Sequence, residues 1–173
     1  MIFQHTWKQV MYGVKTQTRR IKKDHERGQY GALGTINAVE HATTGRVKWA
    51  VGRDYAVQPG RGESSIMRIR ITAIRLERLQ EISEADAKAE GMTRSERLKF
   101  DAQQGIKSKM IVKGGGGHFL PTLSAQDCFR LLWSEIHTRV GTRWEDNPQV
   151  WVLEFELAEA RTFMPLKYSM GDT

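Results

Sequence analysis

Residues 67–76 read Met-Arg-Ile-Arg-Ile-Thr-Ala-Ile-Arg-Leu, and this stretch decides the fold class. Apolar side chains at Met67, Ile69 and Ile71 alternate with polar ones, which is the period of a strand with one buried face. The apolar positions after Ile71 change parity, so we expect a bulge near Ala73. The stretch therefore predicts a long strand in the middle of the chain.

A second strand is predicted near the C-terminal end of the sequence, over residues 150–157, with its aromatic side chains on one face. Between the two strands lie two helices. The first opens at Ser83 and ends at Gly91, and the second opens at Ser124. Shorter elements are expected as a helix at 6–11, strands at 47–51 and 55–57, and a loop with room for one hairpin at 24–46. Strands on both sides of helices predict an α+β barrel or sheet rather than a doubly wound fold.

The positive charge of the chain is concentrated in its first half. The net charge is +7 overall. Residues 1–80 carry 15 Lys and Arg against 6 Asp and Glu, whereas the remainder is slightly acidic. Such an asymmetry favours a nucleic acid or a nucleotide as partner. The single cysteine, Cys128, excludes an internal disulfide, and neither a signal peptide nor an apolar membrane-spanning stretch is visible, so a cytoplasmic location is expected.

The segment Gly13-Val-Lys-Thr-Gln-Thr-Arg-Arg20 offers an amine, hydroxyls and guanidiniums within a few residues. It is either a solvated basic turn or an extended stretch of a binding site. In an extended stretch, residues two apart share a face. Lys15, Gln17 and Arg19 would then point one way, and Thr16, Thr18 and Arg20 the other.

Glu90 is predicted in the last turn of its short helix, where the helix dipole disfavours a carboxylate. It is either a tolerated surface charge or a carboxylate held there for a cation. Two other residues are candidates for ligand contact: Tyr55 could stack on a base, although strand aromatics are usually core, and Arg61 is presented between two glycines.

No metal or cofactor is predicted. The five histidines show no ligand spacing with one another or with Cys128. The glycine run at 114–117 lacks the following Lys and Ser or Thr of a phosphate-binding loop. Cys128 lies beside an apolar helix stripe, so it is interpreted as structural.

Taken together, these segments resemble the ASCH family. Its N-terminal signature, Gly-x-Lys-x-x-x-x-Arg, is present as Gly13, Lys15 and Arg20. The further elements, in family order, are a Gly-Asp-like turn into a strand (52–57, with Arg53 inserted before the aspartate), a strand and short helix (67–91), and an aromatic closing strand with an acidic pair (150–156). The resemblance implies an α+β, PUA-like fold, a small mixed β-barrel flanked by short helices. We expect one domain over 1–160, with insertions at about 24–46 and 93–123, and a C-terminal tail at 161–173.

Within that family, the chain is similar to small bacterial enzymes that remove the acetyl group from N4-acetylcytidine. Their catalytic Lys and Thr lie in a Lys-Thr-x-Thr-x-Arg run, matched by residues 15–20, and their Glu shortly precedes a Met, as Glu90 precedes Met92. The resemblance therefore implies Lys15, Thr18 and Glu90 as the catalytic set. Relatives of this length, with the Gln-Pro-Gly-Arg-Gly element, are familiar from phage genomes.

The first functional hypothesis is an amidohydrolase acting on an N4-acylated cytidine or a related modified nucleoside. The alternatives are a non-catalytic RNA- or DNA-binding module and a ribonuclease. The oligomeric state is left open. Substrate contacts are expected from Arg20, Tyr55, Gln58 and Arg61, and nucleic-acid contacts from Arg19, Arg68 and Arg70. If the family interpretation holds, the Lys15 amine and the Glu90 carboxylate must meet at one cleft within hydrogen-bond reach, with Thr18 and Arg20 facing it.

Overall fold

The computed structural model describes residues 1–92 and 124–160. The insertion expected at about 93–123, with its glycine run at 114–117, lies outside these residues. The described helices and strands, in chain order, are α1 (Trp7–Met11), β1 (Gln17–Ile21), β2 (Glu26–Tyr30), β3 (Ile36–His41), β4 (Val47–Ala50), β5 (Asp54–Val57), β6 (Met67–Arg78), α2 (Glu84–Ala89), α4 (Ala125–Ile136) and β7 (Gln149–Ala160).

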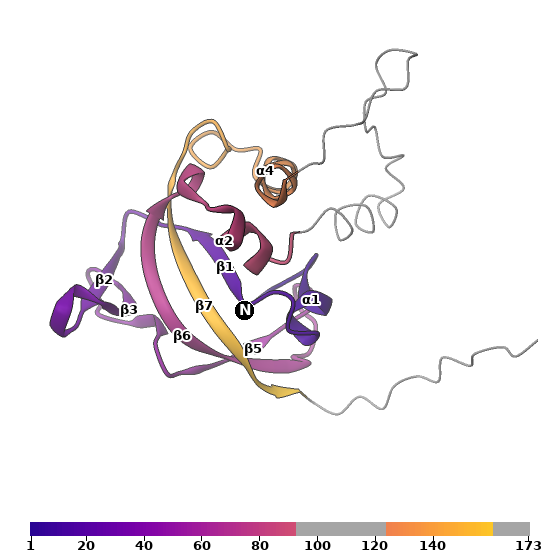
Figure 1. Ribbon diagram of the computed structural model, residues 1–173. Helices are drawn as coiled ribbons and strands as arrows, with labels where there is room; N and C mark the ends of the chain where they lie inside the picture. The colour runs from indigo at the N-terminus through magenta and orange to yellow at the C-terminus, as the bar shows by residue number, and fades with distance from the viewer. Residues whose placement is uncertain (93–123, 161–173) are drawn as a thin grey trace, which may run out of the picture.

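The strands form two antiparallel sheets, one with the order β1-β7-β6-β5 and one with the order β2-β3-β4. The long, curved strands β6 and β7 lie at the centre of the molecule, and the β2–β3 hairpin projects from one side (Figure 1). The α+β class predicted from the sequence is confirmed. Within the described residues β1 and β5 are the edge strands of the larger sheet.

Strand β6 forms where the alternating pattern predicted it, and it extends two residues further, to Arg78. Its register with β7 shifts between Ile71 and Ala73, which is the bulge that the change of parity predicted. Because of the bulge, the apolar side chains before and after Ala73 face the core although their sequence parity differs.

Apolar side chains join the two sheets. Val39 of β3 and Trp49 of β4 pack against Ile71, Trp151 and Leu153 of the larger sheet, and all five are buried. The other face of β7 presents Val150 and Val152 to the helices. Strand β7 is thus buried on both faces, which explains its nearly continuous apolar sequence.

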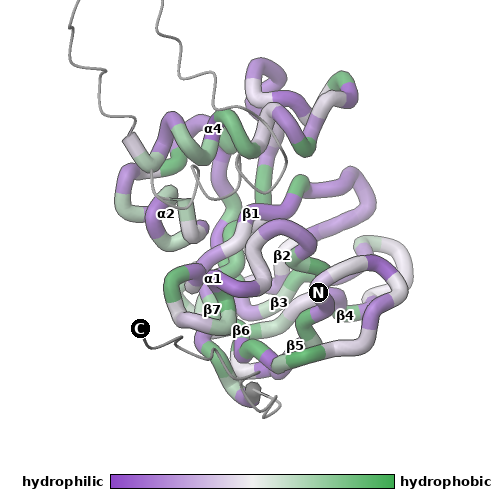
Figure 2. Tube along the Cα trace, turned by 90° about the vertical axis from the view of Figure 1, so that its right-hand side faces the viewer, coloured by the Kyte–Doolittle hydropathy of each residue, from purple (hydrophilic) through white to green (hydrophobic). Residues whose placement is uncertain are grey.

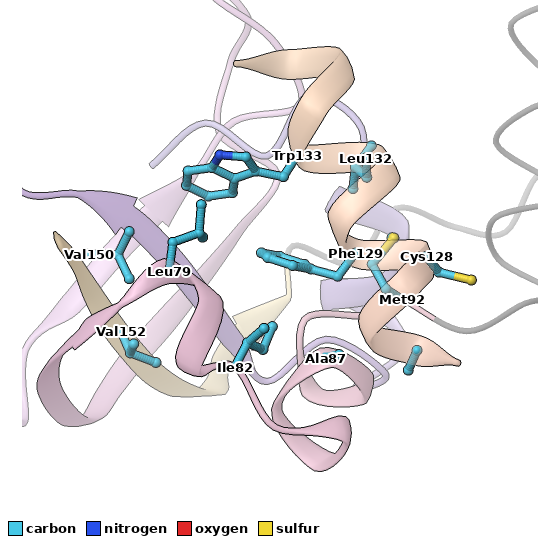
Figure 3. Packing of buried hydrophobic residues seen from close by; sticks show 11 residues of the cluster. Leu79, Ile82, Ala87, Met92, Cys128, Phe129, Leu132, Trp133, Val150 and Val152 are labelled. Atoms are coloured by element: carbon cyan, nitrogen blue, oxygen red, sulfur yellow. The ribbon is translucent and has the colours of Figure 1, made fainter. Parts of the chain in front are cut away.

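Helices α2 and α4 cover that second face and are capped by side chains. Ser83 Oγ accepts the Asp86 N–H at 3.0 Å, and Ser124 Oγ accepts the Asp127 N–H at 3.0 Å. Glu84 of α2 accepts the N–H groups of Ala125 and Gln126, and so joins the start of α4 to α2. Figure 3 shows the apolar side chains of α4 packed against residues of the 79–92 segment and of β7. Of the described helices, none is long and apolar enough to cross a membrane.

Residues 24–46 are more ordered than their sequence indicated. They form the β2–β3 hairpin, whose register shifts between Gln29 and Tyr30. A buried carboxylate hides the strand pattern, because Glu26 points inward, where it accepts the indole N–H of Trp151 at 2.9 Å and binds Lys48 at 2.6 Å. A polar residue at an inward position breaks the alternation on which strand prediction relies.

Candidate active site

A cavity of about 720 Å³ lies beside the edge strand β1. Figure 2 shows this strand between the α2–α4 pair and the N-terminal segment. The cavity is lined by polar and charged side chains as well as aromatic ones, among them Lys15, Thr18, Arg20, Glu90, Trp49, Tyr55 and His137. The cavity therefore brings together residues from the N-terminal segment and β1, from β4 and β5, from the end of α2, and from α4.

Lys15 and Glu90 form an ion pair at this cavity. The Lys15 Nζ lies 2.5 Å from Glu90 Oε2 and also donates to the Glu90 main-chain oxygen at 2.8 Å. The two residues are only 5% and 4% exposed. This geometry is within the hydrogen-bond reach expected for a working pair.

Backbone contacts explain how two residues 75 positions apart meet. The Lys15 N–H donates to the main-chain oxygen of Gln9 in α1, and the next residue, Thr16, donates its N–H to Ala89 O at 2.8 Å. Thr16 O in turn accepts the Phe155 N–H of β7 at 2.8 Å. The segment before β1 is thus fixed between α1, α2 and β7, with Lys15 directed at the end of α2.

Glycine at position 91 permits this close approach. Gly91 has a φ of +81°, which ends α2 and is disfavoured for any other residue. A Cβ placed there would lie 3.1 Å from the Cβ of Lys15 and 3.3 Å from that of Gln9. The residue that stops the helix therefore also makes room for the lysine.

Burial lowers the pKa of Lys15, and the charges of Arg20 and Arg19 lower it further, whereas the contact with Glu90 opposes them. The net effect is a pKa below that of an ordinary lysine. A buried amine of this kind gives up its proton more readily than a surface lysine.

Arg19 holds the other oxygen of Glu90. Its Nη1 lies 3.4 Å from Glu90 Oε1, and its Nη2 lies 3.1 Å from Glu77 and 3.2 Å from Asp86. The Arg19 side chain is 0% exposed. Three carboxylates thus engage the Arg19 guanidinium inside the protein, so the side chain is not presented on the outer surface for the nucleic-acid contact expected of it.

The faces of β1 separate the two groups of side chains. Gln17 and Arg19 face α2, where Gln17 donates to Asp86 Oδ1 at 3.0 Å. Thr18 and Arg20 pair with Leu153 and Trp151, which face the opposite side. Thr18 and Arg20 both line the cavity, Thr18 buried and Arg20 half-buried.

Arg20 is fixed between the N-terminal segment and an aromatic ring. It donates to Ile2 O at 2.9 Å, and its guanidinium carbon lies 5.2 Å from the centre of the Phe3 ring. Burial lowers the pKa of Arg20, and Glu90 opposes the shift. A guanidinium held in this way can still donate to a ligand carbonyl.

Aromatic side chains form much of the remaining wall. Tyr55 accepts the Ala50 N–H through its hydroxyl at 2.8 Å, and Trp49 lies nearby with Lys48 at 4.0 Å from its ring centre. Trp133 and His137 of α4 stack with their ring centres 3.9 Å apart. Sequence reasoning missed His137, and its spacing of four residues from Trp133 on one helix face was the available signal. Burial lowers the pKa of His137, which favours the uncharged form of the ring.

Four of the predicted contact residues lie outside the cavity lining. Gln58 donates to Glu63 O at 2.8 Å in its own turn, and Arg61 is exposed in that turn. Arg68 donates to Asp54 O at 3.2 Å, and Arg70 binds the Asp54 carboxylate at 2.7 Å. The structure thus brings Lys15, Thr18, Arg19, Arg20, Tyr55 and Glu90 together at the cavity, and places Gln58, Arg61, Arg68 and Arg70 elsewhere.

The site shows no arrangement suited to a metal. Among residues 1–92 and 124–160, no group of three or more His, Cys, Asp or Glu side chains could hold an ion. The acidic side chains near the cavity are instead occupied by arginine and lysine.

No family model matches this sequence, and no curated protein matches it. The solved structures that are similar in backbone arrangement include two bacterial proteins. One is an ASCH domain from Lactobacillus crispatus JV V101, with 13% identity and a TM-score of 0.46 over 88% of this chain and 69% of that chain. The other is protein EF3133 from Enterococcus faecalis V583, described under DUF984, with 13% identity and a TM-score of 0.48 over 96% of this chain and 74% of that chain.

Proposed function

We propose that this chain is an ASCH-type domain whose cavity hydrolyses the exocyclic amide of an N4-acylated cytidine or a related modified nucleoside. The observation that carries the proposal is the buried contact of 2.5 Å between Lys15 and Glu90 at a cavity that Thr18 also lines. An amine, a hydroxyl and a carboxylate in one cavity are the groups that amide hydrolysis requires.

Lys15 acts as the base. A threonine hydroxyl is a weak nucleophile and needs a base to take its proton. Burial lowers the pKa of Lys15, which brings the amine closer to the neutral form that a base requires. Lys15 therefore takes the proton of Thr18 as the oxygen attacks the acyl carbon, and returns it to the departing exocyclic nitrogen, which leaves the acyl group on Thr18 as an ester. A water molecule deprotonated by Lys15 then attacks this ester, which releases the carboxylic acid and restores the Thr18 hydroxyl.

Glu90 orients Lys15 and stabilises its charged form. Cations bind both of its oxygens, Lys15 at one and Arg19 at the other. The Glu90 carboxylate lies in contact with the Lys15 ammonium that forms during attack, and attracts it. Arg20 is placed to donate to the acyl oxygen, on which negative charge develops.

The two alternatives, a ribonuclease and a nucleic-acid-binding module, require lysine or arginine side chains that no carboxylate pairs with, and few such side chains line the site. A ribonuclease site would place unpaired positive charge around a phosphate. Here Lys15 and Arg19 are bound by carboxylates inside the protein. On the outer surface, Arg70 is paired with Asp54, and Glu156 lies opposite it on β7. These pairings favour a neutral, planar ligand over a polyanion.

A substrate screen with the wild-type protein tests the proposal. The substrates are N4-acetylcytidine, N6-acetyladenosine, 5′-O-acetylcytidine and a labelled single-stranded RNA with and without a chelator. Selective release of cytidine from the N4-acyl substrate is expected. Cleavage of RNA with no release of cytidine would replace the proposal with the ribonuclease alternative.

A further inference from the structure

Strand β1 has one hydrogen-bonding edge that no described strand occupies. It is the terminal strand of its sheet and pairs with β7 alone. Lys22 N–H donates to Gln149 O, and Phe155 N–H donates to Thr16 O. Since antiparallel residues alternate between the two edges, the even-numbered residues of this strand are directed at β7. The N–H and C=O of Gln17, Arg19 and Ile21 are therefore directed away from it.

The open edge at Arg19 reaches the cavity. Arg19 as a whole is 5% exposed, but its side chain is 0% exposed. Its remaining exposure therefore belongs to the main chain. Since Arg19 is one of the residues that line the cavity, its main-chain groups are what it contributes there.

We propose that the main-chain N–H and C=O of Arg19 bind the cytosine edge formed by N3 and the N4–H group. An extended residue presents its N–H and C=O side by side on one edge of the strand. Cytosine presents an acceptor at N3 beside a donor at N4, and single bases are commonly read through such edges. The Arg19 N–H donates to N3, and the Arg19 oxygen accepts the N4–H. This assignment rests on the proposed function, and it names how the base is selected.

The assignment also orients the substrate for reaction. The exocyclic nitrogen lies at the oxygen of Arg19, one residue after Thr18, whose side chain faces the same cavity. The acyl group on that nitrogen is then presented toward Thr18 and Lys15. The ring plane extends into the part of the cavity walled by aromatic residues such as Trp49 and Tyr55.

This form of recognition predicts which bases are rejected. Uridine carries a donor at N3 and an acceptor at position 4. In the same orientation its N3–H would face the Arg19 N–H, and its O4 would face the Arg19 oxygen. In 3-deazacytidine a C–H replaces the N3 acceptor and leaves the Arg19 N–H unpaired. Loss of one such hydrogen bond in a buried site costs about tenfold in affinity.

Residue-resolved amide hydrogen exchange of the wild-type protein tests the proposal, with cytidine and 3-deazacytidine as probes. Saturating cytidine should slow exchange of the Arg19 amide about tenfold or more, while 3-deazacytidine should bind about tenfold more weakly and leave that amide unprotected. The Arg20 amide, which is directed at Trp151, is the internal control and should be slow in all samples.

The outcomes separate this proposal from the proposed function. Protection of Arg19 by cytidine, without turnover of N4-acetylcytidine, would keep the base-binding edge and remove the amidohydrolase. Turnover with equal binding of cytidine and 3-deazacytidine, or with an unprotected Arg19 amide, would overturn the edge assignment and leave the hydrolase in place.

Discussion

The Lys15 amine and the Glu90 carboxylate, 75 residues apart, lie 2.5 Å from each other in the interior of the protein. Glu90 is the residue at the end of α2, where the helix dipole disfavours a negative charge. Lys15 and Arg19 offset that effect from two sides. Removing either residue would leave the other buried without its partner. The position of the pair at a cavity makes it the centre of the proposed chemistry.

The pH dependence of hydrolysis should follow the neutral form of Lys15. Because burial lowers the pKa of Lys15, kcat/KM should rise with pH and level off at a pH below the ordinary lysine pKa of 10.5. Glu90 opposes this shift, so Glu90→Gln should move the rising limb to lower pH in whatever activity remains. Rate profiles of both proteins measure this, and a limb at higher pH in Glu90→Gln would contradict the assigned base.

Replacing Thr18 with valine should abolish turnover and keep the fold. Valine has a similar shape and lacks the hydroxyl, so kcat should fall by about 10³-fold or more if Thr18 is the nucleophile. Thr18→Ser, which keeps the hydroxyl, should retain measurable activity. Steady-state assays of the two variants are compared, and full activity of Thr18→Val would assign the attack to water.

Gly91→Ala should impair the site through Lys15. The alanine would adopt a φ of +81° and press its Cβ on that of Lys15. Gly62→Ala is a matched control, because Gly62 has a φ of +80° and no atom within 4 Å of an added Cβ. Both variants should lose about 1–2 kcal/mol of unfolding free energy through backbone strain.

Only Gly91→Ala should in addition lower kcat/KM, by about tenfold, since small displacements of catalytic groups are costly. Urea unfolding and activity assays on the two variants provide the comparison. An equal loss of activity in both would show that position 91 has no special relation to the lysine.

Asp86→Asn should destabilise the protein in a pH-dependent way. Burial alone would raise the pKa of Asp86, but hydrogen bonds from Gln17 and the charges of Arg75 and Arg19 lower it to about 2. A lowered carboxylate pKa adds stability that is present above the unfolded value and is lost as the pH falls toward 2. The variant should lose about 2 kcal/mol of unfolding free energy at pH 7.

The difference from wild type should shrink between pH 4 and pH 2, because the carboxyl group of the unfolded chain takes up its proton near its ordinary pKa of 3.8, whereas the native carboxylate keeps its charge until the pH approaches 2. Unfolding free energies from urea titrations across this range measure the effect. A difference that stays constant down to pH 2 would mean that packing, rather than the charge of Asp86, is responsible.

Local patterns predicted the secondary structure where one face of an element is apolar. The alternation of Met67, Ile69 and Ile71 predicted β6 and its bulge, and Ser83 and Ser124 predicted the starts of α2 and α4. One hairpin was allowed for within residues 24–46, but its strands β2 and β3 could not be located, because buried Glu26 takes the place of an apolar residue.

The site depended on contacts that no local pattern contains. The meeting of Lys15 and Glu90 was predicted only through the family resemblance. Arg19 was expected to contact nucleic acid, and its pairing inside the protein could not be predicted, because its carboxylate partners lie 58 to 71 positions away in the sequence. Tertiary pairing, and not residue type, decides whether an arginine binds a ligand or the protein itself.

The release of cytidine from N4-acetylcytidine by the wild type, Lys15→Met and Glu90→Gln, prepared alike and checked for equal folding, tests the central claim most directly. The account predicts turnover by the wild type and a loss of about 10²-fold or more in each variant, because each removes one half of the buried pair. No turnover by the wild type, or equal turnover by all three proteins, would contradict it.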